Sequence, residues 1–201
     1  MFYSITGILA TTELSAAIVD VNGVAFYLHV SAKTHAKLSP KLGEKVTLFT
    51  YLSVKEDALD LYGFISQEEL HAYRLLISVS GVGPKAAMSI LSQMSPEQFA
   101  VAVGTGDTKA ISKSPGVGAK TAARIILELK DKIAKQLSSE EEAVGSGDTD
   151  LLPGRDNLSE AMNALLVLGY TRAEAASVLK TLDSTLSLED MITAALKKLM
   201  K

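Results

Sequence analysis

Two short glycine-containing segments combine features that suit the binding of phosphate groups. Each reads Gly-Val-Gly-X-Lys, at residues 81–85 and again at 116–120, an offset of 35 residues. Glycine tolerates positive φ and lets a phosphate approach the backbone closely. A helix that begins after the glycines presents unpaired N–H groups, and the lysine adds a positive charge beside them. The pair predicts two phosphate-binding hairpins, each pinned to its flanking helices by a valine that turns inward.

A tight turn between two helices is the simpler interpretation of either segment taken alone. The copies also agree beyond the lysine, at Ala87 and Ala122 and at Ile90 and Ile125, which favours a duplicated functional element. A dinucleotide-binding loop would follow a strand, whereas residues 69–77 have a helical pattern. The sequence also lacks the Gly-x-x-x-x-Gly-Lys-Ser/Thr motif of phosphate-binding loops.

The helix after the second copy carries a further cation on the same face. Arg124 follows Lys120 by one helical turn, so both side chains can reach one track of phosphates. A solvated basic face is the alternative. Contacts of this kind hold the DNA backbone without reading base sequence. We expect DNA contacts from ten residues, namely Gly81, Val82, Gly83, Lys85, Gly116, Val117, Gly118, Lys120, Thr121 and Arg124.

Two adjacent carboxylates, Glu56 and Asp57, lie between two strand-like segments. An ordinary solvated turn is the first interpretation. A metal-dependent nuclease centre that includes Asp60 is the second. Two-metal chemistry requires several convergent carboxylates, whereas neighbouring side chains on an extended strand point to opposite faces. The pattern therefore gives the nuclease little support.

These residues must be positioned by a β-rich segment followed by helices. Residues 1–64 contain five runs rich in β-branched and aromatic residues, and Asn22-Gly23 is a strong hairpin signal, which predicts a small barrel of the OB type. Nine of the eleven aromatic residues precede residue 75 and either fill the barrel or stack on bases. The predicted strands are 2–9, 15–21, 24–30, 46–54 and 59–64, with a helical insert at 34–38.

Helical patterns continue to residue 137. Ser66 with Glu69 predicts a capping box, and Ser95-Pro96 predicts another helix start. The predicted helices are 67–78, 84–93, 96–103, 107–112 and 119–136. Residues 138–156 are acidic and rich in Gly and Ser, and therefore predict a mobile linker.

The last segment, residues 157–201, predicts a module of three short helices. Asn157, Thr171 and Ser187 each precede an acidic residue by three positions and mark helix starts, and Gly169 ends the first helix. A core built from so few residues is small, so apolar side chains can stay exposed and invite a partner.

Composition limits the remaining possibilities. The net charge is −3, but residues 64–137 carry nine Lys and Arg against six Asp and Glu, so positive charge gathers where the hairpins are. The chain has no cysteine, and its three histidines are scattered without metal-ligand spacing. We expect no metal and no cofactor. Neither a signal peptide nor an apolar run of membrane-spanning length is apparent, which predicts a soluble cytoplasmic protein.

The stretch 113–124, Lys-Ser-Pro-Gly-Val-Gly-Ala-Lys-Thr-Ala-Ala-Arg, closely resembles the second hairpin of the RuvA family of four-way (Holliday) junction-binding proteins, and the resemblance runs through essentially the whole chain. Family members often have lysine at the position of Ala119. The resemblance implies an α+β multidomain chain with an OB-type barrel at 1–64, a tandem helix-hairpin-helix domain at 65–137, a linker at 138–156 and a three-helix UBA-like domain at 157–201. It also implies that Glu56 and Asp57 form an acidic pin that repels phosphates at the junction centre.

Function and partners follow from the same resemblance. It implies a non-catalytic, sequence-independent binder of Holliday junction DNA that serves branch migration in recombination and repair. It implies a homotetramer, sometimes two tetramers face to face, a RuvB motor that supplies ATP hydrolysis, and a RuvC resolvase in the larger complex. Its C-terminal domain would contact the motor through Leu165, Leu168, Tyr170 and Leu196; most of these are core residues if the resemblance is set aside. A junction nuclease, a base-excision glycosylase and a protein scaffold are the alternatives.

Overall fold

The computed structural model describes residues 2–141, 155–183 and 185–199. The chain packs into two compact units. The first comprises residues 1–77, 82–95 and 114–116, and the second comprises residues 78–81, 96–113 and 117–201. A five-stranded barrel followed by helices confirms the predicted α+β class. The units do not coincide with the sequence domains 1–64 and 65–137, which remain a prediction.

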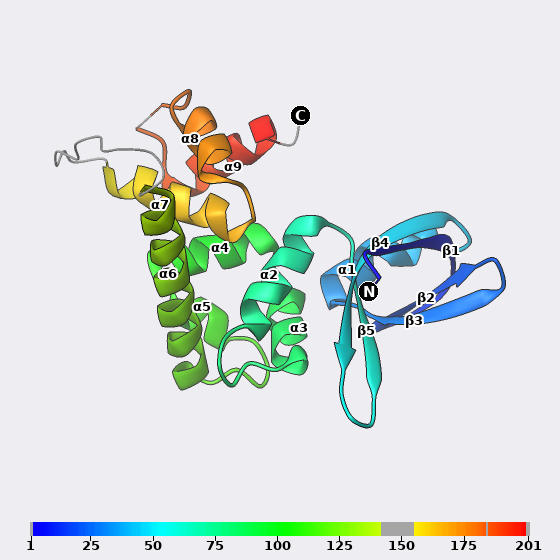
Figure 1. Ribbon diagram of the computed structural model, residues 1–201. Helices are drawn as coiled ribbons and strands as arrows, with labels where there is room; N and C mark the ends of the chain where they lie inside the picture. Colours follow the sequence, from blue (N-terminus) through cyan, green and yellow to red (C-terminus); the bar gives the residue numbers. More distant parts are fainter. Residues whose placement is uncertain (1, 142–154, 184, 200–201) are drawn as a thin grey trace. The chain divides into compact units, whose positions relative to one another are not determined.

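The barrel is closed and its strands follow the order β1-β2-β3-β5-β4 (Figure 1). All neighbouring pairs are antiparallel except β3 and β5, which run parallel. At the β2–β3 turn, Asn22 and Gly23 have φ of 53° and 90°, the positive values that a tight two-residue hairpin requires. The strands are β1 (Ser4–Glu13), β2 (Ala16–Val21), β3 (Val24–His29), β4 (Lys45–Val54) and β5 (Leu59–Phe64).

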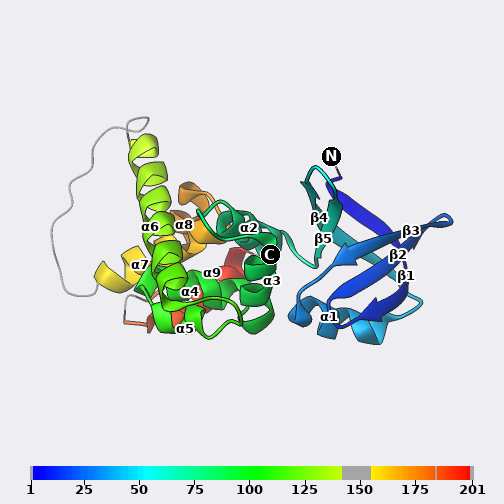
Figure 2. The ribbon, with the colours of Figure 1, turned by 90° about the horizontal axis from the view of Figure 1, so that it is seen from below.

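Alternate side chains of the strands fill the barrel, and a helix between β3 and β4 adds to this core. Helix α1 (Ala32–Leu38) lies across one end of the barrel (Figure 2) and contributes Leu38 to the core. A short 3-10 turn, Ser39–Lys41, leads on to β4. The other core residues are Ile5, Leu9, Ala17, Val19, Leu28, Val30, Val46, Leu48 and Leu61.

A buried carboxylate joins the barrel to helix α2 (Gln67–Ile77). The Glu69 carboxylate accepts hydrogen bonds from the Ser31 hydroxyl at 2.7 Å, the Thr34 hydroxyl at 2.7 Å and the Ile65 N–H at 3.1 Å. The predicted capping box is thus correct in one half only. The Ser66 hydroxyl accepts from the Glu69 N–H, but the Glu69 side chain turns to the start of helix α1, where the Ser31 and Thr34 hydroxyls satisfy it.

Aromatic side chains extend the contact between α2 and the barrel. The ring of Tyr73 lies 5.3 Å from that of Tyr62 and 4.9 Å from that of Phe64, centroid to centroid. All three side chains are buried, whereas Tyr3 and Tyr27 are exposed. Among the described residues, the barrel core cluster given above has no aromatic member, and the one aromatic side chain packed against it is Phe26. The prediction that aromatic residues fill the barrel is therefore wrong for Tyr62 and Phe64, which pack against α2 instead. Helix α3 (Pro84–Gln93) packs against α1 and α2 in the same unit.

The second compact unit is helical. Helix α6 packs against α4 and α5, and α7 packs against α4, α8 and α9. Helix α6 continues past the predicted end at residue 136, because Glu and Ser extend an existing helix at little cost. Residues 142–154 of the predicted linker lie outside the described residues, and its last two residues, 155 and 156, begin helix α7. The helices are α4 (Pro96–Thr105), α5 (Thr108–Ser112), α6 (Ala119–Glu141), α7 (Arg155–Val167), α8 (Arg172–Leu179) and α9 (Leu188–Leu199).

The caps of the C-terminal helices follow the sequence closely, with one exception. Thr171 and Glu174 form a complete capping box at the start of α8. Gly169, with φ of 93°, ends α7, and the Tyr170 N–H returns to the Leu165 carbonyl at 3.2 Å. Asn157 does not begin α7, which starts at Arg155; the Asn157 amide donates to the Leu186 carbonyl instead. Within the described residues, no helix is both long enough and apolar enough to cross a bilayer.

Candidate nucleic-acid interface

The first glycine of each Gly-Val-Gly segment has a positive φ, and the second glycine does not. Gly81 and Gly116, the first glycine of each copy, have φ of 82° and 79°. The second glycines, Gly83 and Gly118, do not have positive φ. The prediction that glycine supplies positive φ is thus confirmed for one glycine in each hairpin. The second glycine precedes a helix, where ordinary extended backbone suffices.

The open space around the second glycine explains the choice of glycine there better than its backbone conformation does. A Cβ added at Gly83 or at Gly118 would meet no atom within 4 Å. The protein therefore leaves the approach to the backbone open at both positions. A phosphate oxygen can reach the amides there, and a side chain would occupy that space.

The valine between the glycines anchors each hairpin. Val82 is 5% exposed and Val117 is 4% exposed, so both side chains turn inward as predicted. A DNA contact by Val82 or Val117 therefore remains a prediction for their backbone groups. Their side chains hold the turn against the fold, and only their backbone is left to face a ligand.

Both hairpins lead directly into a helix, so unpaired amides follow the turn. The first intrahelical bond of α3 runs from the Ala87 N–H to the Gly83 carbonyl, and that of α6 runs from the Ala122 N–H to the Gly118 carbonyl. The N–H groups before these bonds lie outside the helical ladder and form an anion-binding end. Pro84 has no N–H, so α3 offers one donor fewer than α6.

Positive side chains flank these helix starts. Lys85, Lys120 and Arg124 are exposed. A cavity of about 160 Å³ is lined by Ser80, Gly81, Lys120, Thr121 and Arg124. That is several times the roughly 30 Å³ that a water molecule occupies in the liquid, so the cavity can admit phosphate oxygens. It brings residues of the first hairpin turn together with residues of the helix after the second hairpin.

Arg124 has a structural partner that the sequence did not reveal. One of its guanidinium N–H groups donates to the Ser80 carbonyl at 3.3 Å. Arg124 therefore holds the first hairpin turn, and its remaining donors are available to a phosphate. Whether it lies along one phosphate track with Lys120 remains a prediction.

Two further α6 residues hold the same turn and were missed by sequence reasoning. The Glu128 carboxylate accepts from the Ser80 N–H at 3.3 Å. The Lys132 ammonium donates to the Ser78 carbonyl at 2.9 Å and to its hydroxyl at 2.7 Å. Lys120, Arg124, Glu128 and Lys132 are spaced by four, which places them on one face of a helix. The sequence shows this spacing and could have indicated that the four side chains act on one surface, but it does not show that they contact residues 78–80.

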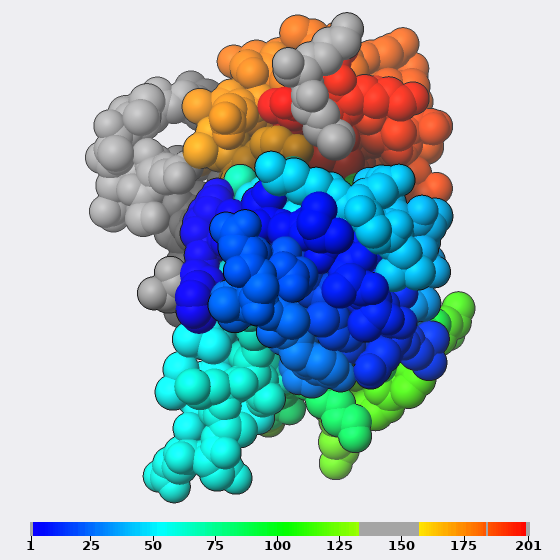
Figure 3. Space-filling view, turned by 90° about the vertical axis from the view of Figure 1, so that its right-hand side faces the viewer, coloured from blue at the N-terminus to red at the C-terminus, as the bar shows by residue number. Residues whose placement is uncertain are grey.

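The carboxylates Glu56 and Asp57 lie at the tip of the β4–β5 hairpin. The Lys55 N–H bonds to the Ala58 carbonyl at 2.9 Å and closes the turn. Both acidic side chains are exposed, as are the neighbouring Val54 and Leu59. The hairpin projects from the barrel as a narrow lobe, cyan in Figure 3. It therefore presents two negative charges on an extended arm.

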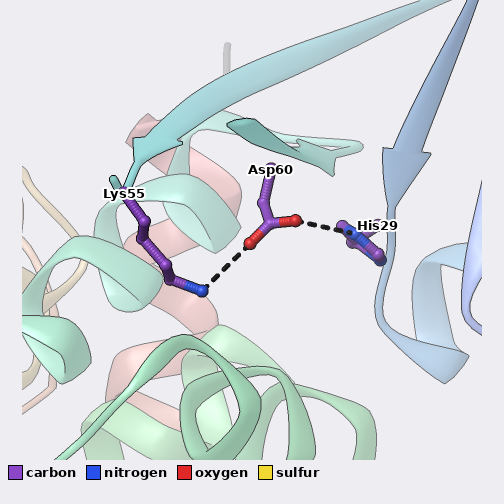
Figure 4. Close-up of polar contacts among 3 residues, drawn as sticks. All are labelled: His29, Lys55 and Asp60. Carbon is purple, nitrogen blue, oxygen red and sulfur yellow. Dashed lines mark hydrogen bonds and ion pairs between the residues drawn. The ribbon is translucent and has the colours of Figure 1, made fainter. Parts of the chain in front are cut away.

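Asp60 is held away from this tip. Its carboxylate lies 3.1 Å from the Lys55 ammonium and 3.8 Å from the His29 imidazole (Figure 4). The hydrogen bond to Asp60 and its negative charge raise the pKa of Lys55 above its ordinary value. Among the described residues, no three His, Cys, Asp or Glu side chains are grouped to hold a metal ion. The geometry thus offers no support for a nuclease centre of Glu56, Asp57 and Asp60.

The C-terminal module buries most of the residues expected to contact a motor protein. Leu165 and Leu168 are buried, Leu196 is 9% exposed, and Tyr170 is half-buried. The three leucines therefore belong to the core of the module, as the residue pattern taken without the resemblance predicted, and their contact with a motor protein stays a prediction. Their small module needs them for its own packing. A role for Tyr170 in partner binding stays a prediction.

Comparison with known proteins covers the whole chain. Three family models match it in order: the RuvA N terminal domain at residues 1–63, a SAM-like helix-hairpin-helix tandem at 73–131, and the RuvA C-terminal domain at 156–200. Proteins named Holliday junction branch migration complex subunit RuvA are similar over the full length of both chains. The chain is 44% identical to the one from Acetivibrio thermocellus, 41% to one from Clostridium perfringens and 43% to the one from Thermoanaerobacter pseudethanolicus. The chain therefore belongs to the RuvA family.

Proposed function

We propose that this chain binds four-way (Holliday) junction DNA and serves as the junction-recognition subunit of a branch-migration complex. The observation that carries the proposal is the duplicated hairpin. Both copies combine a positive-φ glycine, a buried valine, an open second glycine and an exposed lysine at a helix start. The names of the similar proteins describe those relatives as subunits of a Holliday junction branch migration complex.

The hairpins hold the sugar–phosphate backbone of the junction arms. Backbone amides and lysines contact phosphates, whose positions do not depend on sequence, so binding is independent of base sequence. A homotetramer would match a four-armed DNA and present eight hairpins, two from each of four chains. At about 0.9 units of log–log salt slope for each neutralised phosphate, binding weakens steeply as salt rises.

The acidic tip selects the junction over ordinary duplex. Glu56 and Asp57 lie at the turn of the β4–β5 hairpin, which projects from the barrel (Figure 3), and they repel phosphates that run continuously past them. In a four-way junction the strands part at the centre, so the carboxylates occupy a space that a duplex fills with phosphate. The pin thus raises the free energy of duplex binding more than that of junction binding.

Catalysis belongs to the partner. The sequence has no nucleotide-binding motif, so we assign ATP hydrolysis to a RuvB motor that the C-terminal module recruits, and strand cleavage to a RuvC resolvase. The three carboxylates nearest the tip do not converge, because Asp60 pairs with Lys55 and His29. Purified chain should therefore neither hydrolyse ATP nor cleave labelled junction DNA in the presence of magnesium.

The experiment is a competition gel shift with a four-way junction and a linear duplex of equal length and composition at moderate salt. The chain should prefer the junction by at least tenfold, equivalent to about 1.4 kcal/mol. Lys85→Ala with Lys120→Ala should weaken junction binding strongly. Lys180→Ala, which removes an exposed charge after α8, is the matched control and should bind normally. Equal affinity for junction and duplex would refute the proposal.

A further inference from the structure

Two side chains one sequence repeat apart make the same contact. The Arg124 guanidinium donates to the Ser80 carbonyl, and the Ser89 hydroxyl donates to the Pro115 carbonyl at 2.7 Å. The repeat offset of 35 residues relates Ser89 to Arg124 and also relates Ser80 to Pro115. Each helix that follows one hairpin therefore holds the turn of the other hairpin, at the residue just before the first glycine.

The Ser89 contact is a specific one. A serine inside a helix commonly bonds to the carbonyl four residues before it. Ser89 instead reaches a carbonyl 26 residues away, at a distance typical of a good O–H···O bond. The hydroxyl of Ser114, next to Pro115, is buried and has no partner among the described residues, so it does not supply a second anchor.

The two turns differ in how firmly they are held. Ser80 has both an N–H and a carbonyl, and α6 bonds to both through Glu128 and Arg124. The repeat relates Glu128 to Gln93. Because Pro115 has no N–H, Gln93 has no backbone donor there to bond as Glu128 bonds the Ser80 N–H. Among the described residues, the Pro115 carbonyl of the second hairpin accepts one side-chain hydrogen bond, from Ser89, whereas Ser80 of the first hairpin bonds to both Glu128 and Arg124.

We propose that Ser89 is a positioning residue for the second hairpin. By fixing the Pro115 carbonyl, it orients the peptide that leads into Gly116, and so aims the amides at the start of α6 toward phosphate. Ser89 does not itself touch DNA. The proposal rests on the proposed DNA-binding function.

The test is a pair of double-mutant cycles read by junction affinity. Ser89→Ala removes the hydroxyl, Ser89→Thr retains it, and Ser112→Ala removes a hydroxyl that bonds only locally, to the Lys109 carbonyl. Gly118→Ala and Gly83→Ala block the second and first hairpin respectively, and each added methyl meets open space in the protein. Thermal unfolding of every variant separates a folding defect from a binding defect.

We expect Ser89→Ala to weaken junction binding about three- to tenfold, which corresponds to the loss of one hydrogen bond, and Ser89→Thr to restore it. In a chain that already carries Gly118→Ala, the second hairpin is disabled, so adding Ser89→Ala should lower junction affinity by less than twofold. In a chain that carries Gly83→Ala, adding Ser89→Ala should lower junction affinity by the same factor as it does in the wild-type chain. This pattern links Ser89 to the distant hairpin and not to the hairpin that its own helix follows.

Three results would overturn the proposal. If Ser89→Ala bound the junction with wild-type affinity, the positioning role of Ser89 would be refuted, and the proposed DNA-binding function would stand. Coupling to Gly83 in place of Gly118 would show that Ser89 only supports its own helix. Unchanged affinity of both glycine variants would refute the hairpin–phosphate contact itself, and this inference with it.

Discussion

Replacing the two glycines of the second hairpin by alanine should affect different properties: Gly116→Ala should lower stability, and Gly118→Ala should lower junction affinity. Gly116 has φ of 79°, a conformation that costs an L-residue about 1–2 kcal/mol. For a chain of this size, each kcal/mol lowers the melting temperature by about 2–4 °C. Gly116→Ala should therefore lower it by roughly 2–8 °C.

Gly118→Ala should leave stability within about 0.5 kcal/mol of wild type, because its backbone is not left-handed and the new methyl meets no protein atom within 4 Å. The methyl stands where a phosphate would approach. Loss of one charged hydrogen bond is worth about 1.5–3 kcal/mol, which corresponds to a roughly 10- to 100-fold loss of junction affinity.

Gly43→Ala completes the comparison. Gly43 lies between the 3-10 turn and β4, has φ of 80°, and has open space around its Cβ position. It should lose stability as Gly116→Ala does but keep wild-type junction affinity. Differential scanning fluorimetry and junction gel shifts measure the two quantities on the same samples. Normal DNA binding by Gly118→Ala would refute the reasoning that this position is left bare for phosphate.

Two other variants test the pin and the joint between α2 and the barrel. Glu56→Gln with Asp57→Asn should improve duplex binding more than junction binding, measured by competition gel shift. Glu13→Gln, another exposed barrel carboxylate, is the control, and an unchanged junction-to-duplex ratio would contradict the pin's role. Glu69→Ala leaves three donors without their acceptor and should destabilise the protein by about 3 kcal/mol or more in urea unfolding. A loss below about 1 kcal/mol would show that the buried carboxylate is not needed.

Local signals in the sequence predicted most of the elements and the hairpin turns. Asn22-Gly23 specified a tight turn because few residues tolerate positive φ at both positions. The repeat at an offset of 35 residues located both phosphate-binding turns, since glycine spacing and the following lysine are properties of consecutive residues. The acidic tip between β4 and β5 was likewise readable from neighbouring residues.

Contacts between distant residues could not be predicted in this way. Glu69 had the expected capping position, but its carboxylate went to Ser31 and Thr34, more than 30 residues earlier. Arg124 was expected to face solvent and phosphate, and it also holds Ser80, 44 residues away. Burial of Leu165 and Leu168 depends on packing that three short helical patterns do not specify.

The salt dependence of junction binding tests the central claim most directly. Affinity should be measured at several salt concentrations for the wild-type chain, for Lys85→Ala with Lys120→Ala, and for Lys180→Ala. If the hairpin lysines neutralise phosphates, the double variant should show a log–log slope that is shallower by about 0.9 for each lost contact, and Lys180→Ala should retain the wild-type slope. A double variant with the wild-type slope would contradict the account.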